Sequence, residues 1–195
     1  SQLYYNPDIA TRSLKKEFDL FPWTSNMAYI KAWETGMTGI PIVDAGMRQL
    51  YQEGYMHNRL RMIVGSFLVK NLLVHWRHGE RWFWDCLFDA SHASNSASWQ
   101  WIASCGFDAA PYFRIFNPIK QSMNFDPKGQ YIKKYVPELN RLPVPYLFDP
   151  SSAPQPILSN AGISLGITYP VAIVDLKSSR QKALDAYQKF KRSSS

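Results

Sequence analysis

The central part of the chain interleaves aromatic rings with polar side chains whose hydrogen bonds need fixed directions. Residues 57–62 are His-Asn-Arg-Leu-Arg-Met, residues 99–101 are Trp-Gln-Trp, and residues 111–118 are Pro-Tyr-Phe-Arg-Ile-Phe-Asn-Pro. Asp89 and Asn95 lie between the first two runs. A structural core needs the rings, but not so many amides, guanidinium groups and carboxylates on the same elements. The pattern predicts a pocket for a flat heteroaromatic ligand that hydrogen-bonds at several points.

Length and composition limit the kind of protein that positions these groups. The 195 residues are 46% hydrophobic and 15% aromatic, which predicts a single domain over residues 1–195 with a ring-rich core. Cys86 and Cys105 lack metal-ligand spacing, so neither a disulfide framework nor a metal site is expected. No export signal pattern is present, and the longest apolar stretch, Ile63–Val74, is too short to span a bilayer. We therefore expect a cytoplasmic protein.

Positive charge is concentrated at the carboxyl end of the chain. The formal net charge is +7, and from Lys177 onward there are six Lys or Arg residues against Asp185 alone. A basic chain favours an anionic partner, although a charge run is more often a solvated face than a contact site. The net charge therefore says little about the central pocket.

Apolar periodicity predicts helices, and no strand pattern is found. Residues 27–33 predict a helix closed by Gly36, and residues 41–51 a second helix stopped by Gly54. Apolar residues three and four apart predict one long amphipathic helix from His57 to Trp76. On a second face of this helix an amide, a guanidinium, a thioether and a gap come together, from Asn58, Arg61, Met62 and Gly65.

Short helices and irregular segments are expected beyond residue 76. Residues 77–79 predict a turn, 80–88 a helix, 91–98 a loop or capping segment, and 99–103 a buried helix. Seven prolines exclude a long regular element from the segment 137–170. Residues 177–192 have the apolar spacing of a basic surface helix. The predicted fold class is all-α.

Five motifs follow one another in a fixed order and spacing. They are residues 36–45 (Gly-Met-Thr-Gly-Ile-Pro-Ile-Val-Asp-Ala), 56–62 (Met-His-Asn-Arg-Leu-Arg-Met), 99–101, 111–114 (Pro-Tyr-Phe-Arg) and 125–127 (Phe-Asp-Pro). Together they resemble the helical flavin domain of the photolyase/cryptochrome family, most of all the photolyases that repair cyclobutane pyrimidine dimers. The resemblance runs over nearly the whole chain and implies FAD as cofactor and DNA as partner.

The resemblance implies a set of flavin contacts. Asn58, Arg61 and Asp89 match family positions around the isoalloxazine ring, where the arginine and the aspartate pair. Asn95 matches the position that faces flavin N5. A neutral amide there does not readily protonate the flavin, which favours repair over signalling.

The resemblance also implies an electron route. Trp99, Trp76 and Trp23 match three family tryptophans that carry an electron from the surface to the photoexcited flavin. Without the family, each of these rings would more simply be core packing. The complete set favours the electron route.

DNA contacts are implied at four further positions. Met62 and Trp101 match residues that touch a pyrimidine dimer flipped out of the duplex. Arg114, with Arg59 nearby, matches basic groups on the DNA phosphates. For Arg59, a solvated surface charge is an equally good interpretation.

The chain departs from the family pattern in two ways. Where the family usually has Asp-x-Asp, this chain has Asp89-Ala90-Ser91, and the second carboxylate commonly accepts a hydrogen bond from the flavin ring edge. Losing a charge-assisted hydrogen bond costs roughly 1.5 to 3 kcal/mol, so we expect FAD affinity at Ser91 to fall about ten- to a hundredfold. Family members are also considerably longer, so the antenna domain and the early helices that bind the FAD phosphates are expected to be absent.

Three functions remain open at this point. The first is light-driven repair of pyrimidine dimers by electron transfer from reduced FAD. The second is a short photolyase-like module that binds DNA or another nucleic acid with little or no flavin. The third is a cryptochrome-type photoreceptor, which would not need Met62, Trp101 and Arg114 as a lesion-binding set.

Overall fold

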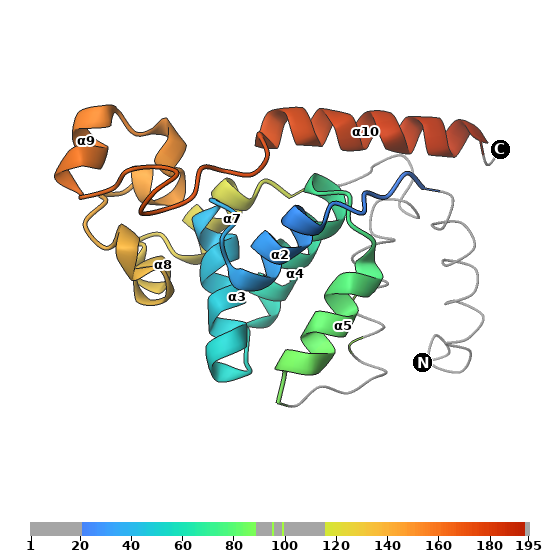
Figure 1. The fold of residues 1–195 in the computed structure, drawn as a ribbon, viewed down its shortest axis with the longest axis horizontal. Coiled ribbons are helices and arrows are strands. Elements are labelled where there is room, and N and C mark those ends of the chain that lie inside the picture. Colours follow the sequence, from blue (N-terminus) through green and yellow to red (C-terminus); the bar gives the residue numbers. More distant parts are fainter. Residues whose placement is uncertain (1–20, 89–94, 96–98, 100–115, 194–195) are drawn as a thin grey trace.

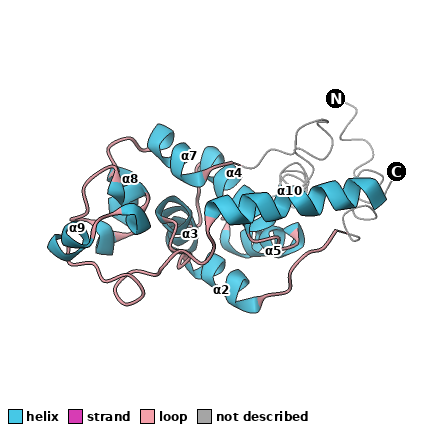
Figure 2. Cartoon of the chain, turned by 90° about the horizontal axis from the view of Figure 1, so that it is seen from above, coloured by secondary structure: helices cyan, strands magenta, loops and turns pink. Residues whose placement is uncertain are grey.

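The computed structural model describes residues 21–88, 95, 99 and 116–193, and within them every regular element is a helix (Figures 1 and 2). The α-helices are α2 (Met27–Thr35), α3 (Pro41–Glu53), α4 (Asn58–Ser66), α5 (Trp76–Cys86), α7 (Pro118–Phe125), α8 (Gln130–Tyr135), α9 (Gln155–Asn160) and α10 (Leu176–Ser193). The predicted all-α class is confirmed.

Helices α2 and α3 form where the sequence predicts them. The Asn26 side chain accepts hydrogen bonds from two backbone N–H groups at the start of α2, and Gly36 ends the helix with a φ of 67°. Pro41 is the first residue of α3, and Gly54 ends that helix, also with a φ of 67°. Both helices run two residues beyond the predicted carboxyl ends.

Helix α3 connects the other helices of the described part. It contacts α2, α4, α5, α7 and α8, and most of its side chains are buried (Figure 1). Helix α2 is tied to α4 by the indole of Trp33, whose Nε1 donates to the backbone O of Val64 at 3.0 Å. Because these helices share one apolar core, burial of that core is the main force holding them together.

The single long helix predicted from His57 to Trp76 is wrong. The α-helix ends at Ser66, and residues Phe67–Asn71 form a π-helix, η2, in which the Leu72 N–H donates to the Phe67 O at 3.0 Å. Leu73 then takes a φ of 55°, which interrupts any right-handed helix. Periodicity missed the break because the residues on both sides of it face the same core.

The break allows the chain to pair with the segment before α2. The Thr24 N–H donates to the Leu73 O at 2.7 Å, and Thr24 and Val74 form an isolated parallel bridge. This pairing brings Trp23, which precedes Thr24, next to His75, which follows Val74.

The turn predicted at residues 77–79 is also wrong, because α5 already begins at Trp76. Nδ1 of His75 accepts a hydrogen bond from the Arg77 N–H at 3.1 Å and so caps the helix. Gly79 therefore lies inside α5, where a glycine is unfavourable unless close packing requires it.

The segment 137–170 contains short elements only. They are the 3₁₀ turns η3 (Pro137–Leu139), η4 (Tyr146–Phe148) and η5 (Pro150–Ser152), followed by α9. Helix α10 then packs on η2, where Asn71 Nδ2 donates to Ser179 Oγ at 3.0 Å, and its buried Ala183 and Tyr187 pack with Phe21 and Leu73. None of the helices in the described part is long and apolar enough to cross a membrane.

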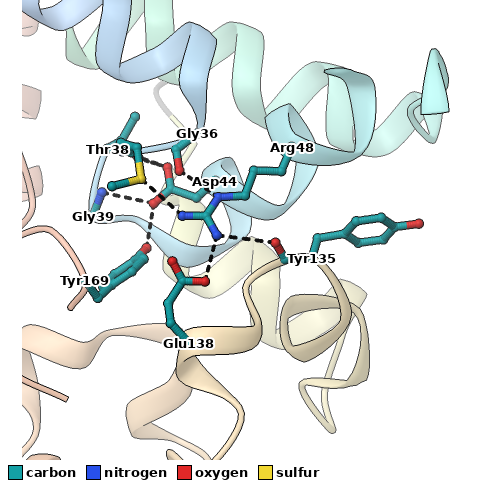
Figure 3. A network of polar contacts seen from close by, with 9 residues as sticks. Gly36, Thr38, Gly39, Asp44, Arg48, Tyr135, Glu138 and Tyr169 are labelled. Atoms are coloured by element: carbon teal, nitrogen blue, oxygen red, sulfur yellow. Dashed lines mark hydrogen bonds and ion pairs between the residues drawn. The ribbon is translucent and has the colours of Figure 1, made fainter. Parts of the chain in front are cut away.

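A buried carboxylate joins α3 to distant parts of the chain (Figure 3). Asp44 Oδ1 accepts from the Thr38 N–H at 2.8 Å and from the Thr38 hydroxyl at 2.6 Å. Its Oδ2 accepts from the Gly39 N–H at 3.1 Å and from the Tyr169 hydroxyl at 2.6 Å. Burial raises the pKa of Asp44, although the hydrogen bonds from Thr38 and Tyr169 oppose the rise. Burial and the neighbouring Asp44 raise the pKa of Tyr169 well above its ordinary value, so its hydroxyl remains the donor.

Arg48, one turn further along α3, makes a second connection (Figure 3). Its Nε donates to the Gly36 O at 3.0 Å, and one terminal nitrogen pairs with Glu138 at 2.8 Å. Burial alone would raise the pKa of Glu138, but the hydrogen bond and charge of Arg48 hold that pKa below its ordinary value of 4.5.

We expect Tyr169→Phe to lower the free energy of unfolding by about 1–3 kcal/mol, because it removes a buried hydroxyl donor from the Asp44 carboxylate. Urea denaturation measures the change. Tyr146→Phe is the matched control, since no hydrogen bond of its hydroxyl is found within the described residues. Equal stability of the two variants would contradict this role of Asp44.

The Arg48–Glu138 pair should also shape the acid stability of the fold. Because the folded-state pKa of Glu138 is lowered, the pair stabilises the protein above pH 4.5, and this contribution is lost as the pH falls through the folded-state value. We expect the melting temperature of Glu138→Gln to fall less steeply than that of the unaltered chain below that pH. If the melting temperatures of the two proteins changed in parallel from pH 7 to pH 3, the pair would have no such effect.

Candidate functional site

Helix α4 carries the first group of predicted ligand residues. Asn58 and Arg59 are exposed on its first turn, whereas Arg61 and Met62 are half-buried. Nε of Arg61 donates to the backbone O of Met56 at 2.9 Å, which holds the guanidinium in place. An arginine held by one nitrogen retains its terminal nitrogens as donors for a carboxylate or the edge of a heteroaromatic ring.

Asn95 is buried and fixed to α5. Its Nδ2 donates to the backbone O of Glu80 at 2.8 Å. Oε1 of the Glu80 side chain accepts from Arg77 at 3.4 Å, while its buried Oε2 has no hydrogen-bond partner within the described residues. An unsatisfied buried carboxylate oxygen beside a fixed amide fits a site that is completed by a hydrogen-bonding ligand. A carboxylate oxygen and a fixed amide are groups that can hydrogen-bond the edge of an isoalloxazine ring.

The buried ring of Trp99 lies against α5. Its centroid is 4.9 Å from that of Phe83, edge-on, and 6.0 Å from that of Trp33. A Cβ atom on Gly79 would lie 2.2 to 2.6 Å from three carbons of the Trp99 six-membered ring. Only glycine at position 79 allows this contact.

Trp76 occupies the same buried face of α5 as Gly79 and Phe83. Its ring stacks on His75 with centroids 5.5 Å apart, and the Arg77 guanidinium lies 4.6 Å from the ring centre. Trp76 Nε1 is buried and has no hydrogen-bond partner within the described residues. A cation over the ring disfavours positive charge on the indole.

Trp23 is half-buried next to the amino end of α5. Its ring meets His75 edge-on at 5.4 Å and Phe21 at 4.7 Å. The backbone pairing of Thr24 with Val74 fixes this position. His75 therefore contacts both outer tryptophans.

The described residues bring together part of the predicted site. Trp99 packs against the face of α5 that carries Trp76, and the His75 ring contacts both Trp76 and Trp23. Asn95 is hydrogen-bonded to the α5 backbone at Glu80. Asp89, Ser91, Trp101 and Arg114 lie outside the described residues. Arg59 is exposed at the start of α4.

Two residues that contact the tryptophan rings have no role predicted from the sequence. Gly79 was assigned to a turn, although a glycine inside a helix also signals close approach. His75 was not singled out at all, although its place directly before a helix is that of a capping residue.

The titratable groups on α5 do not suggest nucleophilic or metal chemistry. Burial, together with Asp85 and Glu34, raises the pKa of the Cys86 thiol to about 11, so it stays protonated at neutral pH. Burial, with Arg81 nearby, lowers the pKa of His78. No cluster of His, Cys, Asp and Glu suited to a metal ion occurs in the part of the chain that is described.

Comparison with known proteins identifies similar sequences and structures. Residues 1–189 match the family model described as the FAD binding domain of DNA photolyase. A deoxyribodipyrimidine photo-lyase of Agrobacterium fabrum is 52% identical over 190 residues, which cover 97% of this chain and 40% of that protein. The chain thus spans about two fifths of the length of this relative.

Solved structures give the same result. The crystal structure of a bacterial class III photolyase from Agrobacterium tumefaciens matches with a TM-score of 0.90 and 52% identity, over 97% of this chain and 39% of that one. A cryptochrome from Synechocystis matches with a TM-score of 0.84 and 36% identity, over 91% and 38%.

Gly79→Ala should destabilise the protein by roughly 1–3 kcal/mol, because the new methyl group displaces the Trp99 ring and this outweighs the helix propensity gained. Trp99→Phe removes the atoms that clash. We therefore expect the double variant to lose less free energy of unfolding than the two single variants lose in sum, as measured by urea denaturation. Strict additivity would show that Gly79 does not position Trp99.

Proposed function

Since the chain belongs to the family of the FAD-binding domain of DNA photolyase, we propose that it holds the isoalloxazine end of FAD and serves light-driven repair of pyrimidine dimers in DNA. The observation that carries this proposal is the placement of three tryptophans along α5. Buried Trp99 packs on Gly79, buried Trp76 lies one turn before Gly79 on the same face, and half-buried Trp23 follows beyond His75. A structural core has no need for oxidisable rings arranged from the interior to the surface.

Each residue at the flavin has a distinct task in this proposal. Arg61 and Asn58 on α4, with Asp89, bind and orient the ring edge. Asn95, held by Glu80, presents an amide that neither takes nor gives a proton at neutral pH. When bound and reduced, FAD supplies the light absorption and the electron that opens the dimer.

Recognition of the lesion is assigned to another group of side chains. Met62, half-buried on α4, and Trp101 are proposed to contact the flipped-out dimer. Arg59, exposed on the same helix as Met62, and Arg114 are proposed to bind the phosphates on either side of the lesion. DNA affinity should therefore fall as the salt concentration rises.

A second candidate function is nucleic-acid binding with little flavin. The observation that favours it is the exposed polar side of α10, where Lys177, Arg180 and Lys182 border an open cavity of about 1050 Å³. A cryptochrome-type photoreceptor is the third candidate, favoured by the likeness to the Synechocystis cryptochrome.

The proposal is tested by the visible absorption of the purified chain with added FAD, followed by a dimer-repair assay under blue light. A flavin band that bleaches under illumination with reductant, together with repair of dimer-containing DNA, supports photolyase chemistry. If the chain does not bind added FAD but binds DNA, the second candidate is supported. Flavin photoreduction without repair or DNA binding supports the third.

Trp99→Phe should abolish photoreduction of bound flavin, because phenylalanine is much harder to oxidise than tryptophan. DNA binding should remain within about twofold, since Trp99 is buried and cannot reach DNA. Illumination with a reductant, monitored by absorption, and a DNA titration measure the two effects. Photoreduction at the original rate would exclude Trp99 from the route.

A further inference from the structure

The contact between the two outer tryptophans passes through a histidine. His75 stacks on Trp76 at 5.5 Å with an interplanar angle of 24° and meets Trp23 edge-on at 5.4 Å. Its Nδ1 also caps α5 by accepting the Arg77 N–H at 3.1 Å. One side chain thus fixes the start of the helix that carries Trp76 and fills the space between the two indoles.

We propose that His75 is the positioning residue for the outer electron-transfer step, holding Trp23 and Trp76 in contact through its ring. The inference rests on the proposed function for the source of the oxidised Trp76. In this step, Trp23 donates one electron to the oxidised Trp76. Trp76 returns to its neutral form, Trp23 becomes the oxidised ring, and His75 keeps its electrons and its proton.

Two independent features indicate that His75 fixes the positions of the two tryptophan rings. The cap fixes the imidazole, because a ring whose Nδ1 accepts a backbone N–H cannot turn freely. The pairing of Thr24 with Val74 fixes the backbone on the other side, so Trp23 and His75 are held from both ends. Electron transfer between rings falls off steeply with separation, so an intervening ring in contact with both indoles speeds the step.

Two variants separate the ring from the cap. His75→Asn keeps an acceptor that can cap α5 but removes the ring. His75→Phe keeps a ring but removes the cap, which should lower the melting temperature by a few degrees. The matched control is His78→Asn, which removes a histidine of α5 that has no ring contact with Trp23 or Trp76 among the described residues.

In the flavin-loaded chain we expect His75→Asn to slow photoreduction at least about tenfold, while His75→Phe and His78→Asn stay within about threefold of the unaltered chain. Loss of rate in His75→Phe but not in His75→Asn would overturn the inference, because the cap alone would then matter. Equal rates in all variants would overturn it too, without touching the proposed function. An unaltered chain that binds flavin but does not photoreduce would instead refute the proposed function.

A second measurement needs no flavin. In chain labelled with 5-fluorotryptophan, the ¹⁹F signals of Trp23 and Trp76, assigned by Trp→Phe variants, report on the positions of these rings. We expect His75→Asn to shift both signals and His78→Asn to leave them in place. Unchanged Trp23 and Trp76 signals in His75→Asn would show that His75 does not position them.

Discussion

The interruption of the helix between Ser66 and Trp76 determines how the rings of this protein are arranged. The π-helical turn and the left-handed Leu73 redirect the chain, so that Val74 pairs with Thr24 and α5 begins anew at Trp76. A continuous helix would have no free backbone groups for Thr24 and no capping position for His75. Trp23 and Trp76 lie close together because that helix is broken.

The carboxyl-terminal half depends on groups buried in α3. The Asp44 carboxylate accepts hydrogen bonds both from Thr38, before α3, and from Tyr169, and Arg48 forms an ion pair with Glu138. The two links span 125 and 90 residues of sequence, and they hold a carboxyl-terminal part in which the segment 137–170 contains short elements only. A buried carboxylate whose hydrogen bonds are all made specifies one arrangement, because each donor would be left unsatisfied in any other.

Local signals in the sequence were sufficient for part of the fold. Gly36, Pro41 and Gly54 set helix ends through backbone conformation, which depends on the residue itself. The break at Leu73 was not predictable, since the residues around it are good core formers and the pairing with Thr24 that stabilises it is a tertiary contact.

The site shows the same division between local and tertiary effects. The spacing along α4 predicts one shared face for Asn58, Arg61, Met62 and Gly65, because a helix face is a local property. Their burial differs, since Arg61 and Met62 are half-buried, Asn58 is exposed and Gly65 is buried. The roles of Gly79 and His75 depend on Trp99 and Trp23, which approach from other parts of the chain. Such contacts are invisible to periodicity.

In the proposed electron route, the charge next to Trp76 would give the outer step its direction. The Arg77 guanidinium lies 4.6 Å from the centre of the Trp76 ring, where it attracts the neutral indole but repels an oxidised one. Glu80 balances part of that charge, at 3.4 Å from Arg77. Half-buried Trp23 has access to water, which stabilises a positive ring better than the buried surroundings of Trp76 do. In the proposed route, both effects would favour movement of the oxidised state from Trp76 to Trp23, and that separation would slow the return of the electron.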